Sequence, residues 1–205
     1  MNMRSFLFSL LAFPLFCIAS IHEQTVFRGH PADDMGDKAH TPFTHAQPTL
    51  ADLLTIESSA SIFYSYSRET ELSALFADEN ARITMLVPTN KAVMALARKP
   101  SRHEGPAPIK EGVILPEKEY DALSKENVNQ WVSAHIIPHS PISLLTPGTH
   151  ETMLDGKNVT FQAVDPDENA PEWTRVRMDD DVRLISMKEA QNGVLYVIDG
   201  TVKLE

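Results

Sequence analysis

The histidines and serines near the middle of this chain are the residues best suited to acid–base or nucleophilic chemistry. His135 lies seven residues after Val128 in an apolar pattern of helical spacing, which favours a buried, hydrogen-bonded structural histidine over a catalytic base. His139 follows closely, and Ser133 and Ser140 flank the pair, so a hydrolase that uses one histidine with one serine is a hypothesis. Nothing nearby suggests an oxyanion site, which makes a hydrolase the weakest of the functions considered.

Clustered acidic residues raise the question of a metal site. Residues 165–169 have the Asp-x-Asp-x-Asn spacing of a calcium loop, but Ala170 stands where the turn needs glycine and Val176 where a bidentate glutamate belongs. The run 179–181 is interpreted as solvated charge, and the single cysteine, Cys17, excludes a paired-cysteine zinc site. We therefore predict no metal and no cofactor.

One modification motif is present. Asn158-Val159-Thr160 is the only sequon for N-glycosylation in the chain, and strand alternation places Asn158 on a polar face. The sequence therefore predicts a glycan on Asn158.

The charge balance excludes two classes of partner. With 18 basic and 28 acidic residues the formal net charge is −10, which disfavours both nucleic acid and an anionic membrane surface. A protein or glycan partner remains.

The N-terminus has the features of a secretory signal. Arg4 precedes an apolar stretch over residues 6–21, and small side chains near Ala19 suit a signal peptidase. We expect a signal peptide over residues 1–19 and entry into the secretory pathway. The apolar stretch is short for a membrane span and no hydrophobic tail ends the chain, so we expect no stable membrane anchor.

Residues 20–48 are predicted to be a disordered linker. They contain several prolines, few apolar side chains and four of the eight histidines. The histidine spacing matches no compact ligand set, so a polar spacer is favoured over a metal-binding tail.

The folded part is predicted to span residues 49–205, with helices first and a mostly antiparallel sheet later, an α+β fold. Thr49 resembles a helix N-cap, the strand over 83–87 is stopped by Pro88, and Thr89 or Asn90 can cap a second helix. Downstream, the sequence predicts a helix over residues 124–137, strands over 159–163, 173–178, 182–187 and 194–198, and hairpin turns at Asp155-Gly156 and Asn192-Gly193.

Four segments together resemble the fasciclin (FAS1) domain family. Residues 84–93 (TMLVPTNKAV) resemble its first signature, and residues 192–199 (NGVLYVID) resemble its second. Residues 134–138 are similar to the family's tyrosine–histidine region, although Ala134 stands where tyrosine is usual. Residues 49–54 resemble its first helix.

The resemblance implies a twisted β-sandwich wedge with a helical layer, formed by one FAS1-like domain. It implies a non-enzymatic interaction or adhesion module of the kind found in secreted proteins and in small soluble fungal proteins of the vacuole lumen. The binding candidates it suggests are His135, Ile136, Ile137 and Pro138. A structural role is expected for Pro88, Thr89, Asn90, Asn192, Gly193 and Asp199. The alternative is a luminal carrier of a small apolar ligand.

Overall fold

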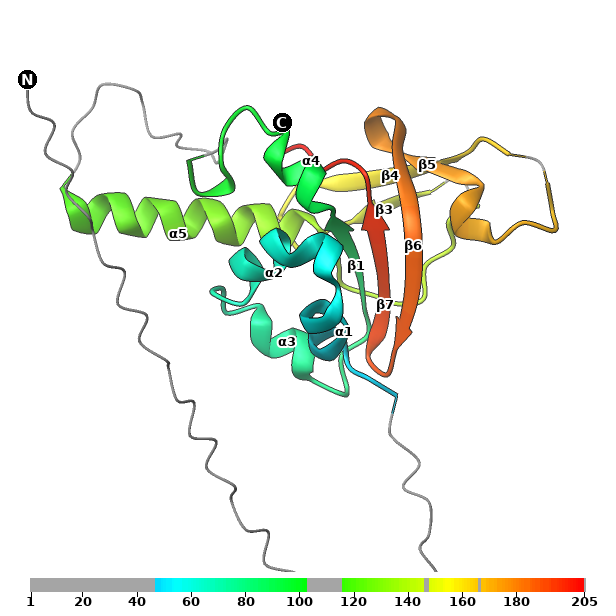
Figure 1. The fold of residues 1–205 in the computed structure, drawn as a ribbon, viewed down its shortest axis with the longest axis horizontal. Coiled ribbons are helices and arrows are strands. Elements are labelled where there is room, and N and C mark those ends of the chain that lie inside the picture. The colour runs from blue at the N-terminus through cyan, green and yellow to red at the C-terminus, as the bar shows by residue number, and fades with distance from the viewer. Residues whose placement is uncertain (1–46, 103–115, 146–147, 166, 205) are drawn as a thin grey trace, which may run out of the picture. The chain divides into compact units, whose positions relative to one another are not determined.

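The computed structural model describes residues 47–102, 116–145, 148–165 and 167–204 (Figure 1). The signal peptide predicted over residues 1–19 and the linker up to residue 46 lie outside these ranges. In the described part, no helix has the length and apolar character needed to span a membrane.

Short helices make up most of the first half of the domain. Thr49 and Asp52 form a reciprocal capping box, so the first helix begins where the sequence predicts. The helices are α1 (Leu50–Ile56), α2 (Ser61–Ser67), α3 (Ser73–Ala77), α4 (Asn90–Met94) and α5 (Glu117–Ala134), with 3₁₀ turns η1 (Ser58–Ala60) and η2 (Pro100–Arg102).

Helix α5 differs from the prediction at both ends. It begins at Glu117 instead of residue 124, because Pro116 precedes it and acidic side chains in its first turn suit the positive end of the helix dipole. It ends at Ala134 instead of residue 137, because Ile136 and Ile137 leave the helix to pair with a strand.

Seven strands form one mixed sheet in the order β2-β1-β7-β6-β5-β4-β3. Within the described ranges β1 and β7 are the parallel pair, so the predicted antiparallel character holds for the other neighbours. The strands are β1 (Ile83–Pro88), β2 (Ile136–Ile137), β3 (Thr149–Glu151), β4 (Asn158–Ala163), β5 (Val176–Met178), β6 (Val182–Ala190) and β7 (Gly193–Ile198).

The strand predicted over residues 173–178 is only half present. Residues Glu172–Thr174 form the 3₁₀ turn η3 instead, and the Glu172 carboxylate accepts hydrogen bonds from the backbone N–H groups of Leu144 and Leu145 at 2.7 and 2.9 Å. The acidic run Asp179–Asp181 forms a further 3₁₀ turn, η4, between β5 and β6.

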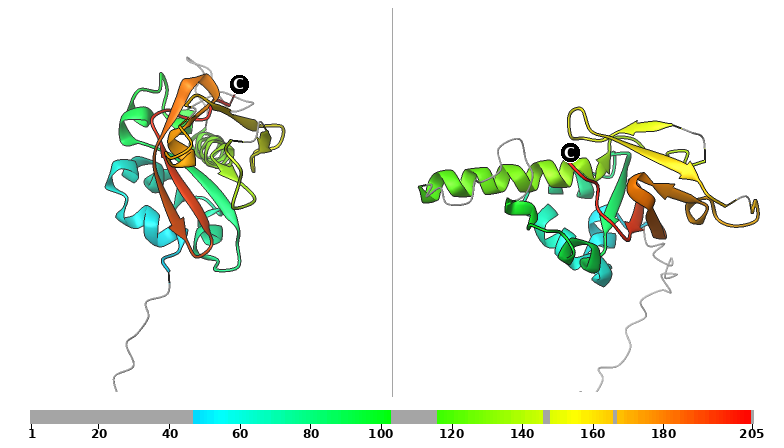
Figure 2. Two further views of the ribbon diagram at one scale, coloured as in Figure 1. Left: turned by 90° about the vertical axis from the view of Figure 1, so that its right-hand side faces the viewer. Right: turned by 90° about the horizontal axis from the view of Figure 1, so that it is seen from above.

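The two ends of the sheet approach each other. The N–H of Met153, just after β3, donates to the carbonyl of Ile136 in β2 at 2.8 Å. Figure 1 shows α1–α3 on one side of β1 and β7 and strands β4 and β5 on the other. The left view of Figure 2 looks along α5. The sheet therefore curls, with helices on its outer side.

This curl produces two hydrophobic cores that share the central strands. Met85, Val87 and Leu195 face the helices, whereas Leu86 and Ile198 face the interior of the curled sheet. A strand buried on both faces requires a continuous apolar sequence, which the stretch over 194–198 has. The α+β wedge predicted from the sequence is confirmed.

Candidate functional site

The two predicted signatures lie side by side at the centre of the domain. They form β1 and β7, which pair in parallel from Ile83 opposite Gly193 to Pro88 opposite Ile198. A Cβ atom on Gly193 would stand 1.9 Å from the carbonyl oxygen of Ile83. Glycine is therefore needed because the two backbones approach so closely.

Asn192 links three parts of the fold and is fully buried. Its side-chain amide donates to the carbonyls of Phe76 and Asp78 at 2.9 and 3.0 Å, and its side-chain oxygen accepts from the N–H of Leu50 at 2.9 Å. The hairpin is where the sequence predicts it, but its two-residue loop is Gln191-Asn192, because Ala190 and Gly193 already pair. Asn192 thus ties the helices to the sheet.

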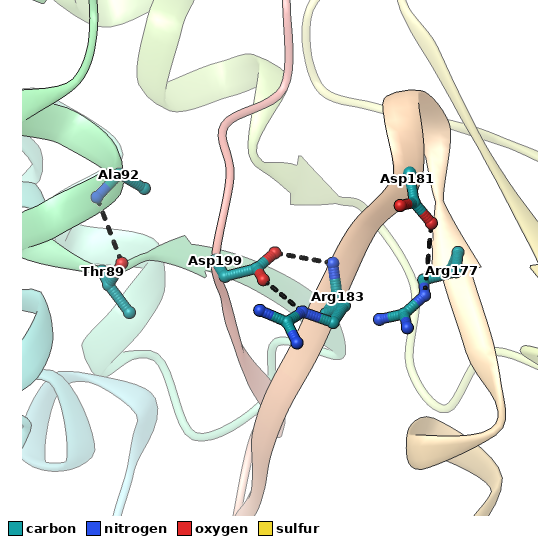
Figure 3. Close-up of polar contacts among 6 residues, drawn as sticks. All are labelled: Thr89, Ala92, Arg177, Asp181, Arg183 and Asp199. Atoms are coloured by element: carbon teal, nitrogen blue, oxygen red, sulfur yellow. Dashed lines mark hydrogen bonds and ion pairs between the residues drawn. The ribbon is translucent and has the colours of Figure 1, made fainter.

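Thr89 and Asn90 do similar work at the other end of β1. The Thr89 hydroxyl accepts the N–H of Ala92 at 3.2 Å and caps α4, as Figure 3 shows. The Asn90 side chain accepts from the N–H of Ile62 at 2.9 Å and donates to the carbonyl of Ser58 at 3.0 Å. The polar side chains of Thr89 and Asn90 in the first signature therefore make their hydrogen bonds within the fold.

Asp199, the last residue of the second signature, holds the adjacent strand. Its carboxylate accepts the N–H of Arg183 at 2.7 Å and the guanidinium Nε at 2.6 Å (Figure 3). The second ion pair in that view, Arg177 with Asp181 at 3.3 Å, involves an aspartate whose side chain is 87 % exposed. An exposed pair of this kind contributes little to stability.

His135 is fully buried, and both of its ring nitrogens are engaged. Nε2 accepts the N–H of Val202 at 3.0 Å, so Nδ1 carries the hydrogen that points to the carbonyl of Trp131 at 2.7 Å. Burial lowers the pKa of His135 to about 4, and the hydrogen bond to Trp131 opposes that effect. The ring also packs against those of Phe63 and Trp131. The histidine is a neutral structural residue, as its apolar pattern predicts.

This arrangement gives no support to the hydrolase hypothesis. His135 has no free nitrogen to act as a base, and in the described part of the chain neither Ser133 nor Ser140 is hydrogen-bonded to His135 or His139. Ser133 is itself buried.

The structure places most of the predicted binding residues in the core. Ile136 and Ile137 are fully buried in β2, and so is His135. Ala134, at the position where tyrosine is usual in the family, packs inside the curled sheet. Of the four candidates only Pro138 is exposed, so the folded domain presents little of this region to a partner.

A recess on the helical layer was not predicted from the sequence. It has a volume of about 560 Å³ and lies between the end of α2 and the middle of α5, with η2 at its border. It is lined by Tyr66, Glu69, Thr70, Glu71, Ser101, Ala122, Ser124, Lys125, Glu126, Val128 and Asn129. These residues come from three separate segments, which is why no local motif indicates the recess.

The recess is more negative than positive. Among the described residues that line it, Glu69, Glu71 and Glu126 outnumber one cation, Lys125. Burial raises the pKa of the Tyr66 hydroxyl, and the charge of Glu69 adds to the effect. Tyr66, one of the lining residues, packs its ring edge-on against that of Trp131 with the centroids 5.9 Å apart.

The remaining predictions concern Asn158, metals and a bound apolar ligand. Asn158 is exposed at the start of β4, on the polar face that strand alternation predicts. Among the described residues, no three histidine, cysteine or carboxylate side chains gather into a metal site. Buried apolar side chains form the two cores, and nothing in these clusters adds support for the carrier hypothesis.

Comparison with known proteins points to one family. The fasciclin domain model matches residues 58–203. A FAS1 domain-containing protein of Emericella nidulans is 28% identical over 160 residues, covering 76% of this chain and 62% of that protein. One of Aspergillus fumigatus is 35% identical over 99 residues, covering 46% and 42%. One of Saccharomyces cerevisiae is 32% identical over 119 residues, covering 54% and 44%.

The solved structures agree on the fold. The structure of a FAS1 domain pair from the insect cell adhesion molecule fasciclin I matches with a TM-score of 0.51 at 12% identity, covering 77% of this chain and 51% of that one. The chain spans about half of the length of the curated relatives it matches, between 42% and 62%. With the family model covering most of the described domain, the chain belongs to the fasciclin (FAS1) domain family.

Proposed function

We propose that this protein is a non-catalytic interaction module of the secretory pathway that binds a protein partner through the recess between α2 and α5. The observation that carries the proposal is a contrast between side chains that make contacts within the fold and side chains that remain exposed at the recess. Side chains of both signatures and of His135 are engaged inside the fold, whereas most side chains that line the recess are polar and exposed or half-buried. FAS1 domains commonly serve as adhesion or interaction modules, which supports the same function.

The chemistry of the recess favours a basic partner segment. The carboxylates of Glu69, Glu71 and Glu126 form a locally negative surface, which attracts lysine or arginine side chains and speeds their encounter. A neutral glycan could donate hydroxyl hydrogen bonds to these carboxylates but would gain no electrostatic attraction from their charge. A protein segment with basic side chains is therefore the expected occupant.

Charge reversal in the recess tests this proposal. The double variant Glu69→Lys/Glu71→Lys is compared with Glu168→Lys/Glu189→Lys, which makes the same change of charge at exposed positions outside the recess. Partners of the tagged full chain are cross-linked in its native cell and quantified by mass spectrometry. We expect at least about a tenfold loss in the recess variant and no loss in the control. Equal recovery with both variants would contradict binding through the recess.

The same tagged protein tests the compartment. We expect it in the vacuole lumen, the culture medium or the cell wall, and we expect an endoglycosidase to increase its mobility in the wild type but not in Asn158→Gln. Recovery in the cytosol without glycan would contradict the secretory assignment.

A further inference from the structure

Two histidines outside the recess come together where the ends of the sheet meet. His139 follows β2 by two residues, and His150 lies in the middle of β3. The hydrogen bond from Met153 to Ile136 brings these strands close. The two imidazole rings have centroids 5.7 Å apart and planes inclined at 45°.

The His150 ring is oriented in a way typical of a metal ligand. Its Nε2 lies 3.2 Å from the carbonyl oxygen of Ser143. A carbonyl only accepts hydrogen bonds, so Nε2 carries the hydrogen and Nδ1 keeps its lone pair. Histidines that bind metals commonly donate their other ring N–H to such a carbonyl, which fixes the ring and its tautomer. Phe161 packs edge-on against the same ring at 5.8 Å.

The His139 ring is also free to act as a metal ligand. The residue is exposed, and within the described ranges its ring nitrogens have no hydrogen-bond partner. Its backbone is anchored, because its carbonyl accepts the hydroxyl of Thr84 at 2.9 Å. The side chain can therefore turn a nitrogen toward His150 without any change in the fold.

The spacing of the rings fits a shared cation. Zinc–nitrogen bonds are about 2.0–2.1 Å long, which puts a ring centroid about 3 Å from the metal and two ligating rings about 5–6 Å apart. The observed 5.7 Å lies in that range. We propose that His139 and His150 bind a divalent transition-metal ion such as Zn²⁺. Nδ1 of His150 and one ring nitrogen of His139 are the ligands, and water completes the coordination.

Thermal unfolding of the full chain with and without Zn²⁺ tests the site. An ion held between two segments of the folded domain binds the native state in preference to the unfolded chain, and so raises Tm. We expect Tm to rise with Zn²⁺ concentration in the wild type and to stay constant in His139→Gln. The control His40→Gln/His45→Gln, which removes two histidines from the N-terminal segment, is expected to keep the full shift.

NMR of the imidazole nitrogens identifies the ligands directly. With one equivalent of Zn²⁺, the ring signals of His139 and His150 should move while those of the buried His135 stay fixed. His150→Gln should abolish the response of His139. If the wild-type Tm does not respond to Zn²⁺, or if His139→Gln retains the shift, the proposal is wrong. Because His139 is exposed, its variant is expected to fold like the wild type, and that variant alone decides the outcome if His150→Gln fails to fold.

Discussion

Individual buried polar side chains join the helices, the sheet and the C-terminal segment of this domain. His135 connects the end of α5 to Val202, and Asn192 connects the hairpin after β6 to α1 and to the end of α3. Each of them has its hydrogen-bonding atoms paired, so burial carries no penalty for an unmade bond. Losing one of these side chains would leave several buried backbone groups unpaired at once.

The lowered pKa of His135 predicts that stability depends on pH. In the unfolded chain the His135 ring takes up a proton near pH 6.5, whereas in the native state it does so only near pH 4. Stability is therefore complete above pH 6.5 and falls by about 3 kcal/mol as the pH decreases from 6.5 to 4. The hydrogen bond from Lys188 holds the pKa of Glu57 below 4.5. The stability that this ion pair contributes is therefore lost only at a lower pH than the contribution of His135.

Urea denaturation at pH 7.5 and pH 5 measures this effect. The wild type and His139→Gln should both have a lower midpoint at pH 5, because both keep the buried His135. His135→Gln should have nearly the same midpoint at both pH values, although a lower one throughout. A wild-type midpoint that is constant between pH 7.5 and pH 5 would show that His135 does not titrate as expected.

For single residues, the sequence predicts burial or a turn better than it predicts which residues a side chain will contact. The apolar spacing around His135 correctly predicts burial, and the Asn-Gly dipeptide correctly predicts a hairpin. The links made by Asn192 span more than 110 residues, and no local pattern carries that information. The binding candidates at 135–137 were expected from the resemblance, yet they lie in the core because Ile136 and Ile137 pair with β1.

Among the secondary-structure elements, the parallel pair β1–β7 is the one on which both cores depend. Parallel strands need a long crossover connection, and here almost the entire second half of the domain lies between them. The short distance between the two backbones at Gly193 leaves no space for a side chain.

Two alanine substitutions compare a glycine that combines a positive φ with a close backbone contact and one that has a positive φ alone. Gly193→Ala puts a Cβ against the Ile83 carbonyl at a φ of +154°, so we expect a loss of about 3 kcal/mol in the free energy of unfolding. Gly156→Ala has open space around it but a φ of +74°, so we expect a loss of about 1 kcal/mol. Urea denaturation of both variants gives the comparison. Equal losses would mean that the contact with Ile83 relaxes freely.

Helix and strand boundaries are where the sequence is least informative. The start of α1 is predicted correctly because its capping box is a local signal. The end of α5 is not, because the β-branched pair at 136–137 continues the helical apolar pattern and only the facing strand β1 reveals it as a strand.

For the molecule as a whole, the two cores are expected to unfold together. Leu195 and Ile198 lie on the same strand but face opposite cores. Truncating a β7 side chain that faces one core therefore weakens the strand on which the other core also depends.

Leu195→Ala and Ile198→Ala test this coupling. Each should cost about 2–5 kcal/mol, and each should lower one common transition. The two tryptophans report separately, because Trp131 lies in the helical core and Trp173 packs against the sheet core. Trp173→Phe leaves Trp131 as the reporter of the helical core, and Trp131→Phe leaves Trp173 as the reporter of the sheet core. When either is combined with Leu195→Ala or Ile198→Ala, the two fluorescence melting curves should coincide. Separate transitions would show that the cores are independent.

The overall α+β architecture could be predicted because four sequence segments carry it in order. The recess could not, since its lining comes from the end of α2 and the turn after it, from η2 and from α5, and their proximity depends on tertiary packing. Its charge cannot be predicted either, because Glu69 and Glu71 follow α2 whereas Glu126 lies in α5, and only the fold brings them to the lining of one recess.

The hydrogen bond from Met153 to Ile136 has a consequence for behaviour at high concentration. Open β-sheets expose unpaired backbone groups along their outermost strands, and these groups recruit further chains into aggregates. Here the short strand β2 uses its outward carbonyl within the same domain. Self-association by strand addition is thereby disfavoured at β2.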